Sequence, residues 1–238
     1  MRGVFITGTD TGVGKTAVGT ALVWALSQQG LTVRPRKPAE SGCPYGTDGL
    51  FPVDGANYQA AAGHREPLAR ICRYRFPAPL SPERAAALQG TDIDLDGLMQ
   101  ACREGVAAED FLLVEGAGGF YSPLATGVLN ADLAVALDLP VLLVTADRLG
   151  AIHQVLVTTE AIRRRGLILA GVVLNELAPP PDVRMDNAAD LTRWLGCEVS
   201  TVRYCGTQQG VPPGRTLAPF LTAVADRMVA SAHNETAE

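Results

Sequence analysis

"GTDTGVGKT", from Gly8 to Thr16, is the stretch of this sequence that decides the fold. It nearly matches G-x-x-x-x-G-K-[ST], the pattern of a phosphate-binding loop, but five residues separate Gly8 from Gly14 where that pattern has about four. When the register is counted back from Gly14, Thr9 stands where the first glycine is normally found. The entry of the loop is altered while its phosphate-facing end is intact, so we predict a variant loop that binds phosphate.

The residues around this loop supply the other parts of a phosphate site. The apolar run from Gly3 to Thr7 predicts a buried strand, and apolar residues at helical spacing in Gly14–Gln29 predict a helix directly after the loop. The N-terminus of a helix attracts anions, while Lys15 and Thr16 suit the terminal phosphates and Mg²⁺. A glycine-rich turn without a ligand has no need of a Lys-Thr pair at that position.

Composition limits the remaining possibilities. The chain has 238 residues, 47% of them hydrophobic, which suffices for one α/β core. We expect a single domain over residues 1–230 and a flexible tail over 231–238. A net charge of -5 gives no reason to expect nucleic acid or a membrane as partner, and no apolar stretch reaches the ~18 residues of a membrane span. The five cysteines form no C-x-x-C pair, so we expect free thiols in a soluble, cytoplasmic protein.

Further along the chain, apolar runs alternate with amphipathic stretches. Each predicted strand follows a predicted helix, and the pairs are Asp94–Ala108 with Phe111–Gly116, Asn130–Leu137 with Pro140–Ala146, and Ile152–Arg165 with Ile168–Glu176. This alternation predicts an α/β, three-layer P-loop NTPase fold with a mostly parallel central sheet and helices on both faces. Right-handed crossovers leave the strand C-termini on one edge, where the site is expected. The glycine and proline residues of Gly42–Gly55 and Ala178–Asp182 predict loops, which we expect to lie over that edge.

Carboxylates near these strand ends are candidates to hold a metal ion. Glu115 closes the Phe111 strand in "VEGAGG", and Asp54 lies in the loop after "KPAESG" (Lys37–Gly42). Mg²⁺ prefers oxygen ligands beside substrate phosphates, so we predict that Thr16, Asp54 and Glu115 bind it. An alternative interpretation is that Asp54 caps a helix beginning near Gly55, and both roles can coexist.

The lysines of the sequence are concentrated in two motifs. Lys15 and Lys37 are the two lysines, and every other fixed cation is an arginine. In a net acidic chain, two lysines placed in a phosphate loop and after a predicted strand are unlike surface solubilising residues. We predict that both contact the phosphate groups, where negative charge gathers.

These motifs together resemble those of the dethiobiotin synthetase family. GTDTGVGKT, KPAESG and VEGAGG occur in the family's order and spacing, together with "FPAPLSP" (Phe76–Pro82), "LGAIH" (Leu149–His153) and "GVVLNE" (Gly171–Glu176). The resemblance runs from Gly3 to about Pro180. It implies an ATP-dependent ring-closing ligase that uses Mg²⁺, in which 7,8-diaminononanoate and CO₂ form a carbamate that takes the γ-phosphoryl group before the ureido ring closes.

The same resemblance implies roles for individual residues. Lys37 and Lys15 are expected to act on the reacting phosphate and carbamate, with Thr11 on the diamine or carbamate side and Ser41 bonded to the substrate. Gly150 and His153 begin a helix that a partner subunit is expected to contribute to the substrate carboxylate, which implies a homodimer with shared active sites. The implied nucleotide contacts are Gly12, Val13, Gly14, Lys15, Thr16, Ala17, Asp54, Glu115, Gly116, Ala117, Gly118, Asn175 and Glu176, with Asn175 on the adenine edge.

Some positions depart from the family pattern. Gly12 replaces a frequent acid, Glu83 follows Ser81-Pro82 where histidine is common, and Cys197–Gly210 differs from the usual strand and turn beside the base. The base contacts expected from Tyr204, Cys205 and Gly206 are therefore open.

Two other functions share parts of these motifs. A cobyrinate-type amidoligase would need a glutaminase domain, for which the chain has no room. A nucleotide-switch ATPase of the partition or maturation type often carries an additional lysine early in the loop, where this chain has Asp10. Neither alternative explains Lys37-Pro38 and Ser41.

Overall fold

The protein is described here by a computed structural model. The structure describes residues 2–178, 184–205 and 213–234. Most of the predicted proline loop, from 179 onward, and the predicted base contact Gly206 lie outside these ranges. Helix α10 runs to Asn234, so it enters the segment predicted as a tail, of which 235–238 also lie outside the described residues.

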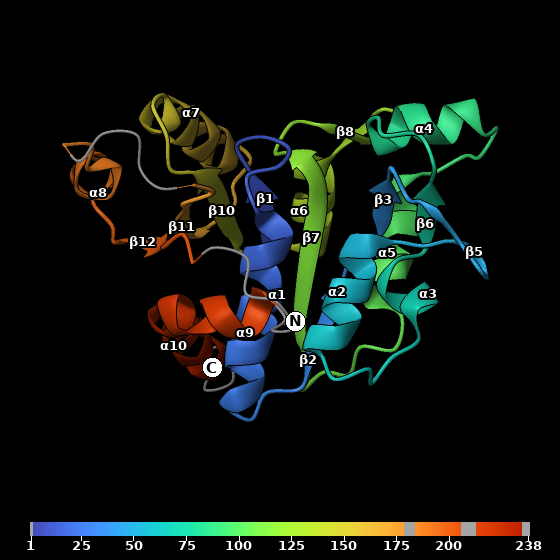
Figure 1. The fold of residues 1–238 in the computed structure, drawn as a ribbon, viewed down its shortest axis with the longest axis horizontal. Helices are drawn as coiled ribbons and strands as arrows, with labels where there is room; N and C mark the ends of the chain where they lie inside the picture. Colours follow the sequence, from blue (N-terminus) through green and yellow to red (C-terminus); the bar gives the residue numbers. More distant parts are fainter. Residues whose placement is uncertain (1, 179–183, 206–212, 235–238) are drawn as a thin grey trace.

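Six parallel strands form the central sheet, which separates two layers of helices (Figure 1). Their order across the sheet is β12-β11-β10-β1-β7-β2. The bounds are β1 Gly3–Gly8, β2 Val33–Arg36, β7 Phe111–Gly119, β10 Val141–Ala146, β11 Leu169–Asn175 and β12 Val199–Val202. The predicted α/β fold with a parallel sheet and the three central apolar strands are confirmed.

Helices cover both faces of this sheet. In Figure 1, α1 and α2 lie on the side nearest the viewer and α6 lies behind β7. The near layer comprises α1 Lys15–Gln28, α2 Val53–Ala61, α3 Leu68–Ile71, α9 Pro213–Leu217, η1 Ala218–Leu221 and α10 Thr222–Asn234. The far layer comprises α4 Pro82–Leu88, α5 Leu95–Arg103, α6 Asn130–Leu137, α7 Ala151–Arg164 and α8 Asn187–Leu195. No helix in the described ranges is long and apolar enough to cross a bilayer.

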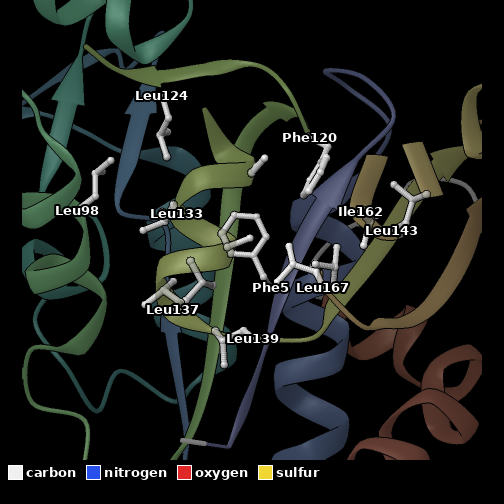
Figure 2. Packing of buried hydrophobic residues seen from close by; sticks show 14 of the residues in the cluster. Phe5, Leu98, Phe120, Leu124, Leu133, Leu137, Leu139, Leu143, Ile162 and Leu167 are labelled. Atoms are coloured by element: carbon white, nitrogen blue, oxygen red, sulfur yellow. The ribbon is translucent and has the colours of Figure 1, made fainter. Parts of the chain in front are cut away.

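Alternate residues of each strand enter different cores. On β1, Phe5 packs into the far core, while Val4 and Ile6 pack into the near core. Figure 2 shows Phe5 beside Leu133 and Leu137 of α6. Because both faces of these strands are buried, they read as continuous apolar runs in the sequence.

Two regions differ from the sequence expectation. The helix predicted over Asp94–Ala108 ends at Arg103, because Gly105 adopts a left-handed φ of 70°. The predicted loop Gly42–Gly55 contains the β4–β5 hairpin and the first residues of α2.

Three short strand pairs lie outside the central sheet. They are β3 Ala39–Ser41 with β6 Tyr74–Phe76, β4 Tyr45–Gly46 with β5 Gly49–Leu50, and β8 Pro123–Ala125 with β9 Val128–Leu129.

Candidate active site

The extra residue of the phosphate loop is accommodated at the end of β1. The N–H of Thr9 donates to the carbonyl of Val144 across 3.0 Å, and its hydroxyl lies 2.8 Å from that of Thr145. Pairing with β10 therefore continues one residue past β1 before the chain turns. Gly12 and Gly14 then adopt left-handed φ values of 74° and 93°. Glycine is needed at this turn because other residues rarely adopt this conformation.

Asn175, at the end of β11, holds the phosphate loop through a side-chain hydrogen bond. Its side-chain Nδ2 donates to the carbonyl of Val13 across 3.0 Å. A Cβ on Gly14 would lie 2.0 Å from the same nitrogen, so the glycine is also required by this close approach. The amide nitrogen of Asn175 thus has a partner within the loop, and the adenine contact stays a prediction.

Lys15 and Thr16 stand at the start of α1. The Lys15 ammonium donates to the carbonyl of Asp10 across 2.9 Å, and the Thr16 hydroxyl donates to Glu115 Oε1 across 3.0 Å. Burial lowers the pKa of Lys15 to about 8, an effect that Glu115 opposes and the nearby Lys37 ammonium reinforces. Because Gly14 has no side chain, it cannot cap α1, so the first N–H groups of the helix have no side-chain acceptor from it.

Lys37 is buried directly after β2 and lies between two carboxylates. Its ammonium is 2.5 Å from Glu115 Oε1 and 3.3 Å from Asp54 Oδ2, and it also donates to the carbonyl of Gly116 across 3.2 Å. Burial by itself lowers the pKa of Lys37, but the charges of Glu115 and Asp54 outweigh it and raise the pKa overall. The Lys37 side chain is therefore a permanent cation in this site.

The carboxylate that caps α2 is Glu40. Its two oxygens accept the N–H groups of Asp54 and Gly55, each across 3.0 Å. Helix α2 begins at Val53 and Asp54 turns toward Lys37, so the interpretation of Asp54 as the cap is wrong. Burial raises the pKa of Glu40, and the Asp54 charge adds to the rise.

A buried tyrosine completes the contacts of Glu115. The Tyr58 hydroxyl on α2 donates to Glu115 Oε2 across 2.7 Å, and Tyr58 has no exposed surface. Burial, together with the Glu115 charge, raises the pKa of Tyr58 well above its ordinary value. Tyr58 therefore stays protonated and acts as a donor.

The loop, Lys37 and the acidic turn border one cleft of about 570 Å³. The predicted site residues that line it are Thr11, Gly12, Gly14, Lys15, Thr16, Lys37, Ser41, Asp54, Glu115, Ala117 and Gly118. Ser41 donates its hydroxyl to the carbonyl of Leu80 across 2.6 Å, which joins two stretches of the cleft lining. The cleft thus joins residues from five separate stretches of the chain in one cavity, at the edge where the strands end.

Comparison with known proteins assigns the chain to a family. Residues 2–203 match a family described as an AAA domain (AAA_26). A protein of Anaeromyxobacter dehalogenans named ATP-dependent dethiobiotin synthetase BioD is 45% identical over 194 residues, covering 81% of this chain and 85% of that protein. A protein of the same name from Vesicomyosocius okutanii is 38% identical, covering 84% of this chain and 88% of its own length. The chain belongs to the ATP-dependent dethiobiotin synthetase family.

Solved structures agree with the fold. A ParA family ATPase of Chlorobium tepidum has a TM-score of 0.56 and 14% identity, over 96% of this chain and 98% of that one. The cell division ATPase MinD of Pyrococcus furiosus has a TM-score of 0.51 and 16% identity, with the same coverage of both chains. Identities this low show a shared P-loop fold and nothing about a switch function. The dethiobiotin synthetase relatives confirm the predicted family and the class of ATP-dependent ligase, and the solved structures confirm the predicted fold.

Several residues expected from the dethiobiotin synthetase family lie outside the cleft. Gly150 and His153 are exposed at the start of α7, and Ala17 borders a separate groove between α1 and α2. Glu176 pairs with Arg203 across 2.7 Å and accepts the N–H of Tyr204 across 3.0 Å, which joins the ends of β11 and β12. Cys205 donates its thiol to the carbonyl of Arg203. Their contacts with ligands stay predictions.

Other residues of the cleft were missed by the sequence reasoning. Ser122 and Pro123 also line the cleft and lie outside every motif named from the sequence. The other additional lining residues belong to the KPAESG and FPAPLSP motifs but had no predicted role; they are Glu40, Pro79, Leu80, Ser81 and Pro82. Tyr58 does not line the cleft itself, but its hydroxyl contacts Glu115, which does. No local pattern distinguishes Tyr58 or Ser122 from ordinary helix and turn residues.

Proposed function

We propose that this chain makes dethiobiotin from 7,8-diaminononanoate, CO₂ and ATP, releasing ADP and phosphate. The observation that carries the proposal is the meeting of both lysines and a variant phosphate loop in one cleft of a dethiobiotin synthetase family member. One amine of the diamine adds to CO₂ and loses a proton, giving a carbamate. The carbamate oxygen takes the γ-phosphoryl group from ATP, and attack of the second amine on the carbonyl carbon closes the ring as phosphate leaves.

The charges in the cleft suit this chemistry. Carbamate and triphosphate repel each other, so their approach needs cations where negative charge accumulates. Lys15 stands at the head of α1, where it can reach the terminal phosphates. Lys37 lines the same cleft as Ser41 and Thr11, and we assign it to the carbamate and the transferred phosphoryl group. We assign Ser41 and Thr11 to hydrogen bonds with the diamine or its carbamate.

The oxygen atoms near Lys37 fit Mg²⁺. Thr16 Oγ1 and Glu115 Oε1 lie 3.0 Å apart, and Asp54 reaches the same ammonium that Glu115 binds. One hydroxyl and two carboxylates are the hard ligands that Mg²⁺ takes beside phosphate oxygens. When bound, Mg²⁺ would neutralise charge on the phosphates, and these three residues would hold it.

The exposed start of α7 supports a shared site between two copies. Gly150 has a φ of 91° and leaves the first N–H groups of α7 without a side-chain cap. Leu149 beside it is 90% exposed, which leaves apolar surface for a second copy to cover. We assign this helix start, with His153, to the substrate carboxylate in the cleft of the partner subunit of a homodimer. The use of ATP supports a cytoplasmic location.

Labelled bicarbonate tests the reaction itself. The purified protein would be given MgATP, 7,8-diaminononanoate and ¹³C-bicarbonate, and the products would be analysed by mass spectrometry. The proposal predicts dethiobiotin that carries one labelled carbon and forms only when ATP is present. Unlabelled product, or none, would overturn it.

A further inference from the structure

An unusual glycine lies within the first helix of the nucleotide site. Gly19 is buried in the interior of α1, where glycine is a poor helix former and alanine would stabilise the helix. Its φ is not in the left-handed region, so no turn requires a glycine here. A Cβ at this position would lie 1.8 Å from the Tyr58 hydroxyl oxygen and 2.8 Å from the carbon that bears it. The missing side chain leaves room for Tyr58.

Tyr58 uses that room to reach Glu115. Helices α1 and α2 pack against each other on the near face of the sheet (Figure 1). The Tyr58 hydroxyl passes Gly19 and donates to Glu115 Oε2. The other oxygen, Oε1, accepts from Thr16 and Lys37. Each oxygen of this carboxylate, which is 1% exposed, therefore has its own donors.

This division of donors fixes how the carboxylate is turned. The last torsion of a glutamate side chain is broad, so donors on one oxygen restrain its rotation less than donors on both oxygens do. We infer that Tyr58 is a positioning residue, which holds Glu115 so that Oε1 faces Thr16 and Lys37. The inference rests on the proposed nucleotide site, and it concerns the hydroxyl of Tyr58, since a phenylalanine ring would fill the same space.

Tyr58→Phe tests this inference through nucleotide binding. Calorimetry would measure ATP affinity over a series of Mg²⁺ concentrations and again with a metal chelator. Tyr58→Phe loses a hydrogen bond to a buried charge. The Mg²⁺ concentration that gives half of the maximal increase in ATP affinity should therefore rise by about tenfold. Metal-free ATP affinity should stay within about twofold, since Lys15 and the loop backbone are untouched.

Tyr74→Phe is the matched control. The Tyr74 hydroxyl also faces a helical glycine, since a Cβ on Gly97 would lie 2.5 Å from it. Unlike Tyr58, Tyr74 donates no hydrogen bond to Glu115 in the described part of the chain. This control should keep the wild-type Mg²⁺ dependence. In a Glu115→Gln background, Tyr58→Phe should add no further change, because its effect passes through Glu115.

Two results would overturn the inference. One is an unchanged Mg²⁺ dependence in Tyr58→Phe. The other is an equal loss of metal-free and Mg²⁺-dependent binding with a lowered unfolding temperature, which would mean that the hydroxyl serves general packing. If the wild-type protein binds MgATP but forms no dethiobiotin, the proposed function is wrong. The Tyr58 test stays valid in that case, because it measures nucleotide binding and not product.

Discussion

Lys37 and Glu115 form a buried ion pair at the centre of the cleft, with Nζ 2.5 Å from Oε1 and side chains only 5% and 1% exposed. Lys15, in contrast, donates to a backbone carbonyl and has no carboxylate within ion-pair distance among the described residues. The two lysines therefore differ in how they are held. Lys37 is fixed by protein groups, whereas Lys15 has a weaker neutral partner that a phosphate oxygen can replace.

Replacing Lys37 should separate binding from catalysis. We expect Lys37→Ala to bind MgATP within about threefold of wild type while turnover falls about a hundredfold or more, because Lys37 acts mainly in the transition state. Calorimetry and phosphate release measure the two quantities, and thermal unfolding checks that the variant is folded. Unchanged turnover would remove Lys37 from the mechanism.

Replacing Lys15 should weaken binding itself. Lys15→Ala loses a charge-assisted contact to the terminal phosphates, so ATP affinity should fall by about tenfold or more. Calorimetry with ATP measures this change directly. If the variant bound ATP as tightly as wild type, the assignment of the phosphate loop would be wrong.

The two left-handed glycines of the loop should tolerate alanine differently. At Gly14, a Cβ would meet Asn175 Nδ2 at 2.0 Å, whereas at Gly12 nothing lies within 4 Å. Both changes add backbone strain of about 1 kcal/mol, but only Gly14→Ala must also displace Asn175. We expect Gly14→Ala to abolish measurable ATP binding and Gly12→Ala to retain it. Equal affinities in calorimetry would contradict the supporting role of Asn175.

Breaking the buried ion pair beside Lys37 should strongly destabilise the fold. Arg36 has no exposed surface and binds both oxygens of Glu66, at 2.9 and 3.1 Å. Glu66→Ala leaves this guanidinium without its carboxylate, which should lower the free energy of unfolding by about 3 to 5 kcal/mol. Urea denaturation measures this free energy.

An exposed pair supplies the control for that experiment. Glu160 and Arg164 lie one turn apart on α7, and their side chains are 62% and 77% exposed. Glu160→Ala should change the free energy of unfolding by about 0.5 kcal/mol or less. Similar losses in Glu66→Ala and Glu160→Ala would show that burial of the Arg36 pair is not important.

Some of the site could be predicted because its signals are local in the sequence. The phosphate loop and Glu115 lie at or directly after apolar runs that predict strands, and parallel strands bring such ends together. Lys37 is recognised by its motif instead, because the strand before it, β2, has the sequence VRPR and is not an apolar run. Thr9 could be recognised as the shifted position, and the structure explains it by one more residue of pairing with β10.

The rest of the site depends on contacts between distant segments. Tyr58 meets Glu115 across 57 residues of sequence, and neither α2 nor the acidic turn carries a pattern that reports this contact. Glu40 caps α2 from 14 residues away, so the usual search for a cap just before the helix points to Asp54 instead. The path of the Tyr58 side chain depends on its close approach to Gly19 of α1, which no local pattern in α2 reports.

Phosphate release is the measurement that tests the central claim most directly. The purified protein would be assayed with MgATP and bicarbonate, with and without 7,8-diaminononanoate, and then with CTP and GTP in place of ATP. The account predicts release that depends on the diamine, and the nucleotide series would define what the divergent Cys197–Gly210 segment accepts. Release that is independent of the diamine, or no release at all, would contradict the ring-closing function.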